Sequence, residues 1–294
     1  MPQDGLARKI MAVDCSLDPQ WDDTFLGSSS AALAQLYRDE ESRGYAHPSE
    51  HLFKDAADRV KGGNSVEDTL AMMDEFGIEK AIVPVDTERP NEALRMIAKH
   101  PKRLYGKLGV NPMEGMEALR KIDDIVKGNP HIKALSVSPF TIQRPPNDKV
   151  YYPLYAKAID LDLPITMTVG LPGPRVPGEM QNPIYLDEPL WFFPELKIVM
   201  MHGGEPWEAM CVKLMLKWPN LYFMTSAFAP RHYPKDIVYY ANTRGADKVM
   251  FAGYYPGLSY DRIQDDLQEL ALRDHVWPKF LRENATSVFK LDDA

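Results

Sequence analysis

The sequence predicts a single (β/α)8 barrel of the TIM-barrel class, with one long insertion after the first strand. Eight short apolar runs of the kind found in buried parallel strands recur along the 294 residues, and amphipathic stretches separate them. Alternating strands and helices favour a parallel sheet, and eight such units close into a barrel more readily than they form an open sheet. An open, doubly wound sheet is the alternative.

In chain order, the predicted strands cover residues 10–15, 80–85, 104–110, 132–137, 164–169, 196–201, 221–225 and 248–252. The stretch SVEDTLAMMDEFG between the first two is typical of a helix, because Ser65 can cap its start and Gly77 can end it. NEALRMIAKHP and MEALRKIDDIVKGNP repeat the amphipathic pattern. We therefore predict one domain over residues 1–294.

Residues 16–64 interrupt this rhythm, since they separate the first strand from the helix before the second. A long loop at the carboxyl end of a barrel strand is often a lid or a substrate wall. We predict that this insertion covers the active site; packing on the barrel exterior or a contact between subunits is the alternative. A second long loop, rich in proline and glycine, follows the fifth strand at residues 170–189 and lies on the same face.

Composition excludes several classes of protein. The net charge of -8 and the pI of about 5.4 offer no basic patch for nucleic acid. No apolar run approaches the roughly 20 residues of a membrane span, and two cysteines, Cys15 and Cys211, imply no disulfide framework. The amino-terminal residues lack a signal-peptide pattern, so we expect a cytoplasmic protein with a small-molecule substrate.

Three segments resemble the amidohydrolase-related family, which includes proteins like aminocarboxymuconate-semialdehyde decarboxylase. They are VMMHGGEPW at residues 199–207, KVMFAGYYP at 248–256 and KFLRENATSVFKL at 279–291. The resemblance extends from VDCSLD near the start to the last helix. It implies a TIM barrel of the amidohydrolase superfamily, and a hydrolase or carbon–carbon lyase, such as a decarboxylase, hydratase or lactonase, acting on carboxylated or aromatic small molecules.

By this resemblance, most of the family's metal ligands are replaced. Ser16 and Asp18 stand where the family has a His-x-His pair, and Leu171, or in a shifted alignment Thr168, stands at the histidine of the fifth strand. His202 matches a family histidine, whereas Tyr254 stands at the catalytic aspartate.

A catalytic divalent metal needs about three protein ligands, so we expect an enzyme without a cofactor. A rebuilt zinc or manganese site is the alternative. Its ligands would be Asp18 and His202, with Asp14 and Glu205 as further oxygen donors.

The carboxyl ends of barrel strands meet around one pocket, whose polar candidates are Asp14, Ser16, Asp18, Asp86, Lys107, Ser136, Thr168, His202, Ser226 and Tyr254. We predict that His202 transfers the proton, that Asp18 orients it or acts as a base, and that Tyr254 donates a proton or binds an oxyanion. The hydroxyls of Ser16 and Ser226 can bind substrate oxygens.

Three arginines, Arg144, Arg175 and Arg231, lie in loops after the fourth, fifth and seventh strands, where a guanidinium can bind a substrate carboxylate. They favour an anionic substrate. Aromatic residues that can line an apolar pocket beside them are Trp21, Tyr45, Phe53, Tyr185, Phe228 and Tyr260.

The leading hypothesis is a metal-independent enzyme that hydrolyses a lactone or ester, or cleaves a carbon–carbon bond, in a small carboxylated or aromatic substrate by acid–base catalysis. Pyrone-dicarboxylate lactonases of the same family work without an essential metal. The alternative from another class is a catalytically inactive barrel that binds a ligand or is the partner of an active paralogue in a hetero-oligomer. Self-association into a homo-oligomer is also compatible with the sequence.

Overall fold

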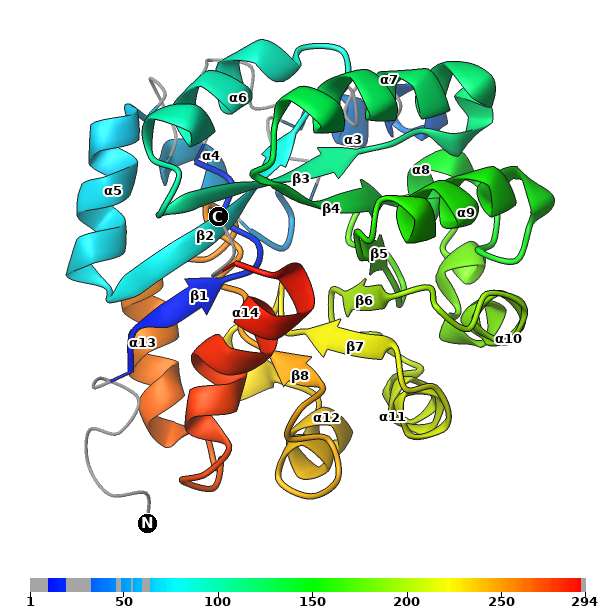
Figure 1. Ribbon diagram of the computed structural model, residues 1–294. Coiled ribbons are helices and arrows are strands. Elements are labelled where there is room, and N and C mark those ends of the chain that lie inside the picture. The colour runs from blue at the N-terminus through cyan, green and yellow to red at the C-terminus, as the bar shows by residue number, and fades with distance from the viewer. Residues whose placement is uncertain (1–9, 20–32, 46–48, 54, 60–63, 292–294) are drawn as a thin grey trace.

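The protein is described by a computed structural model over residues 10–19, 33–45, 49–53, 55–59 and 64–291. Its centre is one sheet of eight parallel strands in the order β1 to β8 (Figure 1). The strands are β1 Ala12–Asp14, β2 Ile78–Val85, β3 Leu104–Gly109, β4 Ile132–Val137, β5 Ile165–Thr168, β6 Ile198–Met201, β7 Leu221–Met224 and β8 Val249–Met250. Each of them coincides with one of the eight predicted apolar runs.

Helices surround the sheet (Figure 1). They are α3 Glu40–Arg43, α4 Ala56–Arg59, α5 Val66–Glu75, α6 Pro90–Lys99, α7 Met116–Gly128, α8 Pro139–Ile142, α9 Tyr152–Asp160, α10 Asp187–Phe192, α11 Glu208–Lys217, α12 Lys235–Ala241, α13 Tyr260–Glu269 and α14 Asn284–Phe289, with 3-10 or π-helical turns η1 Pro112–Glu114, η2 Lys149–Tyr151, η3 Glu179–Gln181, η4 Pro183–Leu186, η5 Pro230–His232 and η6 Lys279–Glu283. Helix α5 begins as predicted, because the Ser65 hydroxyl accepts a hydrogen bond from the backbone N–H of Asp68 at 3.0 Å.

Hydrogen bonds between the segments that follow β1 and β8 close the sheet. The backbone N–H of Cys15 donates to the carbonyl of Phe251 at 3.3 Å, and the N–H of Gly253 donates to the Asp14 carboxylate at 2.9 Å. The outermost strands therefore meet. The prediction of a (β/α)8 barrel is confirmed, and the open sheet is excluded.

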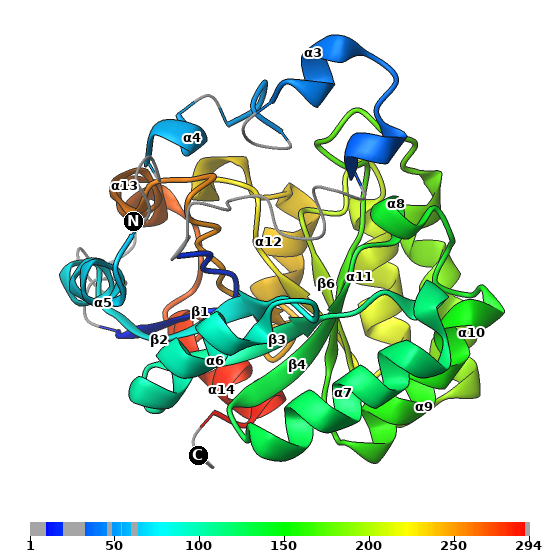
Figure 2. The ribbon, with the colours of Figure 1, turned by 90° about the horizontal axis from the view of Figure 1, so that it is seen from above.

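Apolar side chains fill the inside of the barrel, and the last helix covers one of its ends. Val288 and Phe289 of α14 belong to the same buried cluster as Val13 and Tyr105. The Tyr105 hydroxyl donates to the carbonyl of Leu291 at 2.8 Å. Figure 2 shows α14 on the side of the barrel opposite α3 and α4. The amino ends of the strands are thus closed, which leaves their carboxyl ends for a site.

The described parts of the predicted insertion lie at the carboxyl ends of the strands (Figure 2). Arg59 donates from its guanidinium to the carbonyls of Pro256 and Gly257, at 2.7 and 2.9 Å. The ring of Phe53 lies 5.5 Å from that of Tyr254. These contacts join the segment to the loop after β8. Its role as a lid stays a prediction, and Trp21 lies outside the described residues.

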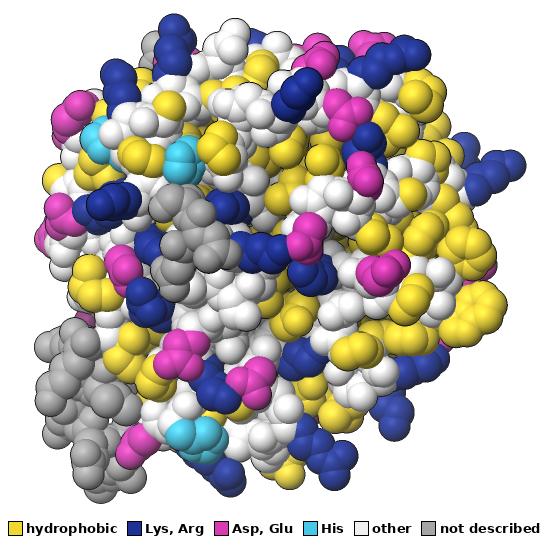
Figure 3. All heavy atoms as spheres, viewed as in Figure 1, with side chains coloured by type: hydrophobic (Ala, Val, Ile, Leu, Met, Phe, Trp, Pro, Cys, Tyr) yellow, Lys and Arg dark blue, Asp and Glu magenta, His cyan; other side chains and the backbone are white. Residues whose placement is uncertain are grey.

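Basic and acidic side chains are interspersed on the face that carries α14 (Figure 3). At the edge where α10 lies, hydrophobic side chains gather, and Trp191 and Phe192 are 70% and 57% exposed there. Among the described residues, we find no helix with the length and apolar character needed to cross a membrane.

Candidate active site

The backbone is unusual within four residues of the ends of three neighbouring strands. His202, Ala227 and Tyr254 follow β6, β7 and β8, and all three adopt positive φ angles, of 68°, 70° and 61°. Residues other than glycine rarely adopt this left-handed conformation, and such backbone strain is concentrated at functional sites. The carboxyl end of the barrel on the side of β6 to β8 is therefore the place to look for the reaction centre.

His202 is held in position by a serine of the next strand's loop. Its ring atom Nδ1 lies 2.9 Å from the Ser226 hydroxyl, which also accepts a hydrogen bond from the His202 backbone N–H at 3.2 Å. Burial, and then the charge of Lys107, lower the pKa of His202 to about 3. The imidazole is thus neutral near pH 7. The contact with Ser226 determines which ring nitrogen carries the proton, and hence whether Nε2 accepts or donates one.

Glycine is required directly after His202. A Cβ atom on Gly203, whose φ is 77°, would lie 2.1 Å from the ring of Phe228. The loop after β6 can therefore pass against the loop after β7 only without a side chain at this point. This close approach brings Ser226 within reach of His202.

Tyr254 packs across His202. The two rings meet edge to face, with their centroids 5.0 Å apart. Burial, and then the charge of Asp18, raise the pKa of the Tyr254 phenol to about 12. The phenol therefore keeps its proton and can donate a hydrogen bond to an oxygen that gains negative charge.

Lys107 brings a positive charge into the same site. It lies two residues after Tyr105 on β3, so both side chains point to the barrel interior. Its Nζ atom donates to the Ser16 hydroxyl at 2.9 Å and to the Cys15 carbonyl at 3.5 Å. Burial lowers the pKa of Lys107, while the charges of Asp14 and Asp18 oppose that shift.

From the sequence, Lys107 was one of ten polar candidates for the pocket, and no role was predicted for it. A lysine within an otherwise apolar strand was the available signal. Its contact with Ser16 could not be foreseen, since β1 and β3 are separated by β2 and do not pair.

The Asp14 carboxylate is occupied by hydrogen bonds within the protein. Its carboxylate accepts hydrogen bonds from the Tyr260 hydroxyl and from the backbone N–H groups of Ser16 and Gly253. Tyr260 begins helix α13, outside the sheet. Asp14 therefore fastens the loops after β1 and β8 to that helix and has little capacity left for a ligand.

Two of the three predicted substrate-binding arginines are paired with carboxylates of the protein. Arg175 contacts Glu41 at 3.0 Å, and Arg231 donates to Asp266 at 2.7 Å. Arg144 is exposed in the segment after α8. The structure thus brings four of the predicted site residues together: Ser16, His202, Ser226 and Tyr254. Asp18 is near enough to affect the pKa values of Tyr254 and Lys107. Arg175 and Arg231 instead have partners within the protein.

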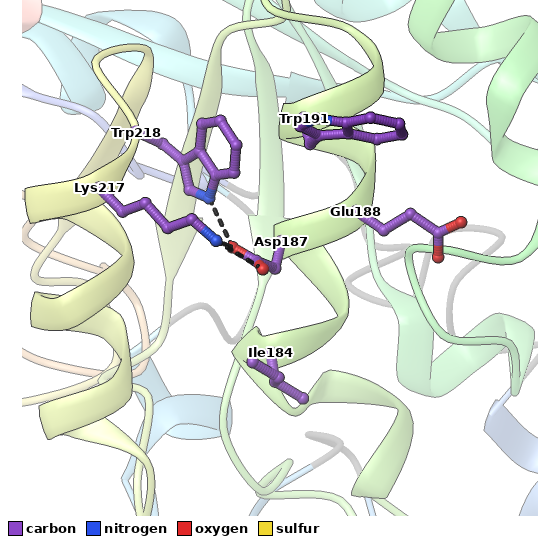
Figure 4. A pocket seen from close by; sticks show the side chains of 6 residues that line it. All are labelled: Ile184, Asp187, Glu188, Trp191, Lys217 and Trp218. Carbon is purple, nitrogen blue, oxygen red and sulfur yellow. Dashed lines mark hydrogen bonds and ion pairs between the residues drawn. The ribbon is translucent and has the colours of Figure 1, made fainter.

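A surface pocket elsewhere is separate from this site. Figure 4 shows it between α10 and α11, lined by Ile184, Asp187, Glu188, Trp191, Lys217 and Trp218. Asp187 accepts from the Lys217 ammonium at 2.7 Å and from the Trp218 indole N–H at 2.8 Å. Asp187 is occupied by these bonds, and Glu188 accepts from the Asn147 amide at 3.2 Å, so we assign the pocket no chemistry.

The sequence matches the family described as Amidohydrolase over residues 21–291. The chain belongs to the amidohydrolase family. Membership places it among enzymes of hydrolase or lyase type. No curated protein matches it.

Several solved structures share the fold. An uncharacterised TIM-barrel protein from Bordetella bronchiseptica is 20% identical with a TM-score of 0.74, covering 96% of this chain and 99% of that one. The 5-carboxyvanillate decarboxylase of Novosphingobium aromaticivorans, complexed with manganese and 4-hydroxy-3-methoxy-5-nitrobenzoic acid, is 16% identical with a TM-score of 0.69 and 98% coverage of both chains. The 4-oxalomesaconate hydratase of Rhodopseudomonas palustris is 16% identical with a TM-score of 0.62, covering 96% and 97%.

The residues of this site do not fit the metal ion that the fold family implies. Thr168 and Leu171 are the two candidates for the position at β5 where the sequence resemblance implies a histidine ligand. Thr168 is hydrogen-bonded to Gln181, and Leu171 is 60% exposed. Within the described ranges, no three His, Cys, Asp or Glu side chains lie close enough to hold a metal. An ammonium group beside Ser16 would also repel a divalent cation at that position. The expectation that no cofactor is needed stays a prediction.

Proposed function

We propose that the protein is a lyase that removes carbon dioxide from a small carboxylated aromatic compound by acid–base chemistry of its own side chains. The observation that carries this proposal is the contact of His202 with Tyr254, near the buried Lys107, at the carboxyl end of the barrel. A neutral base, a protonated phenol and a cation are thereby combined in one site. Structural neighbours that act on carboxylated aromatic compounds, such as 5-carboxyvanillate decarboxylase, support the substrate class.

In the proposed reaction, a proton taken up from solvent passes through His202 to the ring carbon that carries the carboxyl group, and a new carbon–hydrogen bond forms there. The bond between this carbon and the carboxyl carbon then breaks, carbon dioxide leaves, and the electron pair of that bond restores the aromatic ring. An oxygen substituent on the ring gains charge in this second step, which a hydrogen bond from Tyr254 stabilises. Because burial lowers the pKa of His202 to about 3, the resting ring is neutral and holds the proton only while it passes from solvent to the ring carbon.

Hydrolysis of a lactone or ester needs the same groups in related roles. His202 would take a proton from water, and Lys107 and Tyr254 would stabilise the oxyanion that forms on the carbonyl. The hydratase among the structural neighbours supports activation of water on this fold. Decarboxylation and hydrolysis are separated by the product: one releases carbon dioxide, the other does not.

The test is turnover of 2,6-dihydroxybenzoate, 5-carboxyvanillate and a set of aromatic lactones, followed by carbon dioxide release and by absorbance. We expect decarboxylation by the wild type and a loss of about 10²- to 10⁴-fold in His202→Asn. Asparagine tolerates the left-handed backbone at this position. His232→Asn, at an exposed histidine, is the matched control and should leave kcat unchanged.

A wild type that releases no carbon dioxide from either carboxylate would overturn the proposal. Hydrolysis of the lactones would then identify the other reaction. Binding of the carboxylates without any turnover would favour an inactive, ligand-binding barrel.

A further inference from the structure

Lys107 can be compared with a second buried lysine, Lys80, which lies at the other end of the barrel. Lys80 on β2 is also buried inside the barrel, and its Nζ atom donates to the carbonyl of Leu291 at 3.2 Å. That lysine lies at the closed end of the barrel, where the chain after α14 covers it. Lys107 lies at the opposite end, next to His202 and Ser16.

The ammonium of Lys107 retains capacity for a ligand. A lysine has three N–H donors. In the part of the chain that the structure describes, two oxygens accept from Nζ, namely Ser16 Oγ at 2.9 Å and the Cys15 carbonyl at the long distance of 3.5 Å. At least one donor is therefore available to an anionic oxygen beside Ser16.

Charge favours the same conclusion. A cation buried in a barrel needs anionic groups close by. Asp14, one of the two carboxylates that act on Lys107, is fully buried and already accepts three hydrogen bonds from other residues. Asp18, the other, is only partly buried. A substrate carboxylate would complete the pairing of the ammonium group.

We propose that Lys107 takes the place of a divalent cation and binds the carboxylate of an aromatic substrate that also carries a hydroxyl group. This inference deepens the proposed function and rests on it for the substrate class. The carboxylate complements the ammonium group, and the hydroxyl complements Asp18, whose backbone N–H donates to the carbonyl of Tyr255, next to Tyr254, at 2.9 Å. Lys107 thereby selects the substrate and fixes its orientation against His202.

The experiment compares two probes that differ only in the carboxylate, 2,6-dihydroxybenzoate and resorcinol, in calorimetric titrations at pH 7. All chains carry His202→Asn, so that 2,6-dihydroxybenzoate is not converted to resorcinol during the titration. The variants are Lys107→Met, Lys107→Arg and, as a matched control at the other buried lysine, Lys80→Met. We expect the chain with both native lysines and Lys80→Met to prefer 2,6-dihydroxybenzoate. Lys107→Met should bind it about 10- to 100-fold more weakly and bind resorcinol unchanged, because only a charge-assisted hydrogen bond is lost.

A preference that survives in Lys107→Met would overturn the inference, as would a chain with both native lysines that does not distinguish the probes. If Lys107→Met does not fold, as judged by circular dichroism, Lys107→Arg decides, since it keeps the charge and should keep most of the preference. If the protein binds the carboxylate selectively through Lys107 but turns over no substrate, Lys107 is the anion site and the proposed reaction is wrong. If the protein turns over the substrate and Lys107→Met binds as well as the native chain, the proposed reaction holds and the role of Lys107 is wrong.

Discussion

Burial determines the protonation states of single side chains at the carboxyl end of the barrel. His202 loses its proton to the surroundings, whereas Tyr254 keeps its own, and each shift has burial as its first cause. A base and a hydrogen-bond donor thus lie in edge-to-face contact.

The stability of the protein should depend on pH through His202. The unfolded chain binds a proton at this residue below pH 6.5, whereas the folded chain does so only near pH 3. The stability that the neutral ring contributes is complete above pH 6.5 and is lost as the pH falls through that interval, by up to about 1.4 kcal/mol per pH unit. Urea denaturation from pH 7.5 to 4.5 should show a shallower fall for His202→Asn than for the wild type. Parallel curves would contradict the assignment.

The phenol of Tyr254 should matter for catalysis but little for folding. Tyr254→Phe keeps the ring that packs between His202 and Phe53 and removes only the hydroxyl. We expect kcat to fall by about 10²- to 10³-fold, the usual effect of losing one donor to a developing oxyanion, with an unchanged melting temperature. Tyr239→Phe, at a residue that is 73% exposed, serves as the control. Equal kcat values for the two variants would remove Tyr254 from the mechanism.

Residue patterns in the sequence located part of this site. His202 and Tyr254 were found because each stands in a short motif directly after an apolar strand. The pairing of Arg231 was not foreseen, because Asp266 is 35 residues further along the chain and on α13. Contacts of this kind depend on how helices pack around the barrel, and no local pattern encodes them.

At the scale of elements, the strands form the barrel, and the loops after them carry the candidate site. The eight apolar runs fixed the strands to within a few residues, because a strand buried on both faces needs a continuous apolar sequence. The loops were less predictable. The close approach of the loops after β6 and β7 depends on Gly203 against Phe228, which only the folded chain brings together.

Gly203→Ala should therefore disrupt the site through the loop. The new methyl group would meet the Phe228 ring at 2.1 Å in a left-handed backbone, so the loop must shift. We expect a loss of about 2–3 kcal/mol in the free energy of unfolding and a large loss of activity. The control is Gly128→Ala at the end of α7, where no atom lies within 4 Å of the added carbon. Circular dichroism melts compare the stability of the two variants. A Gly203→Ala variant as stable as the wild type would contradict this prediction and show that the loop shifts at no cost in free energy.

The whole molecule is a barrel whose amino end is closed by α14 and whose carboxyl end carries the candidate active site. Chains that are 16–20% identical share this fold over nearly their full lengths. The fold depends on the apolar pattern, which many sequences satisfy, whereas the reaction depends on a few polar positions. That difference explains why the sequence predicted the architecture well and the chemistry only in outline.

Closure of the amino end should contribute strongly to global stability. Phe289 on α14 is 1% exposed within the cluster that fills the barrel. Phe289→Ala should lower the free energy of unfolding by about 3–5 kcal/mol, because it leaves a cavity in that cluster. KM should not change, since the site lies at the other end. Denaturant titration and steady-state kinetics test this, and a changed KM with unchanged stability would contradict the separation of the two ends.

The central claim is that the side chains of this barrel, with Lys107 as the cation, carry out the chemistry without a bound metal. The most direct measurement is elemental analysis of protein purified without added metal, paired with activity on 2,6-dihydroxybenzoate before and after chelation. The account predicts far less than one equivalent of metal per chain and activity that survives the chelator. Near-stoichiometric manganese or zinc, together with activity that the chelator abolishes and added metal restores, would contradict it and favour the rebuilt metal site that includes Asp18 and His202.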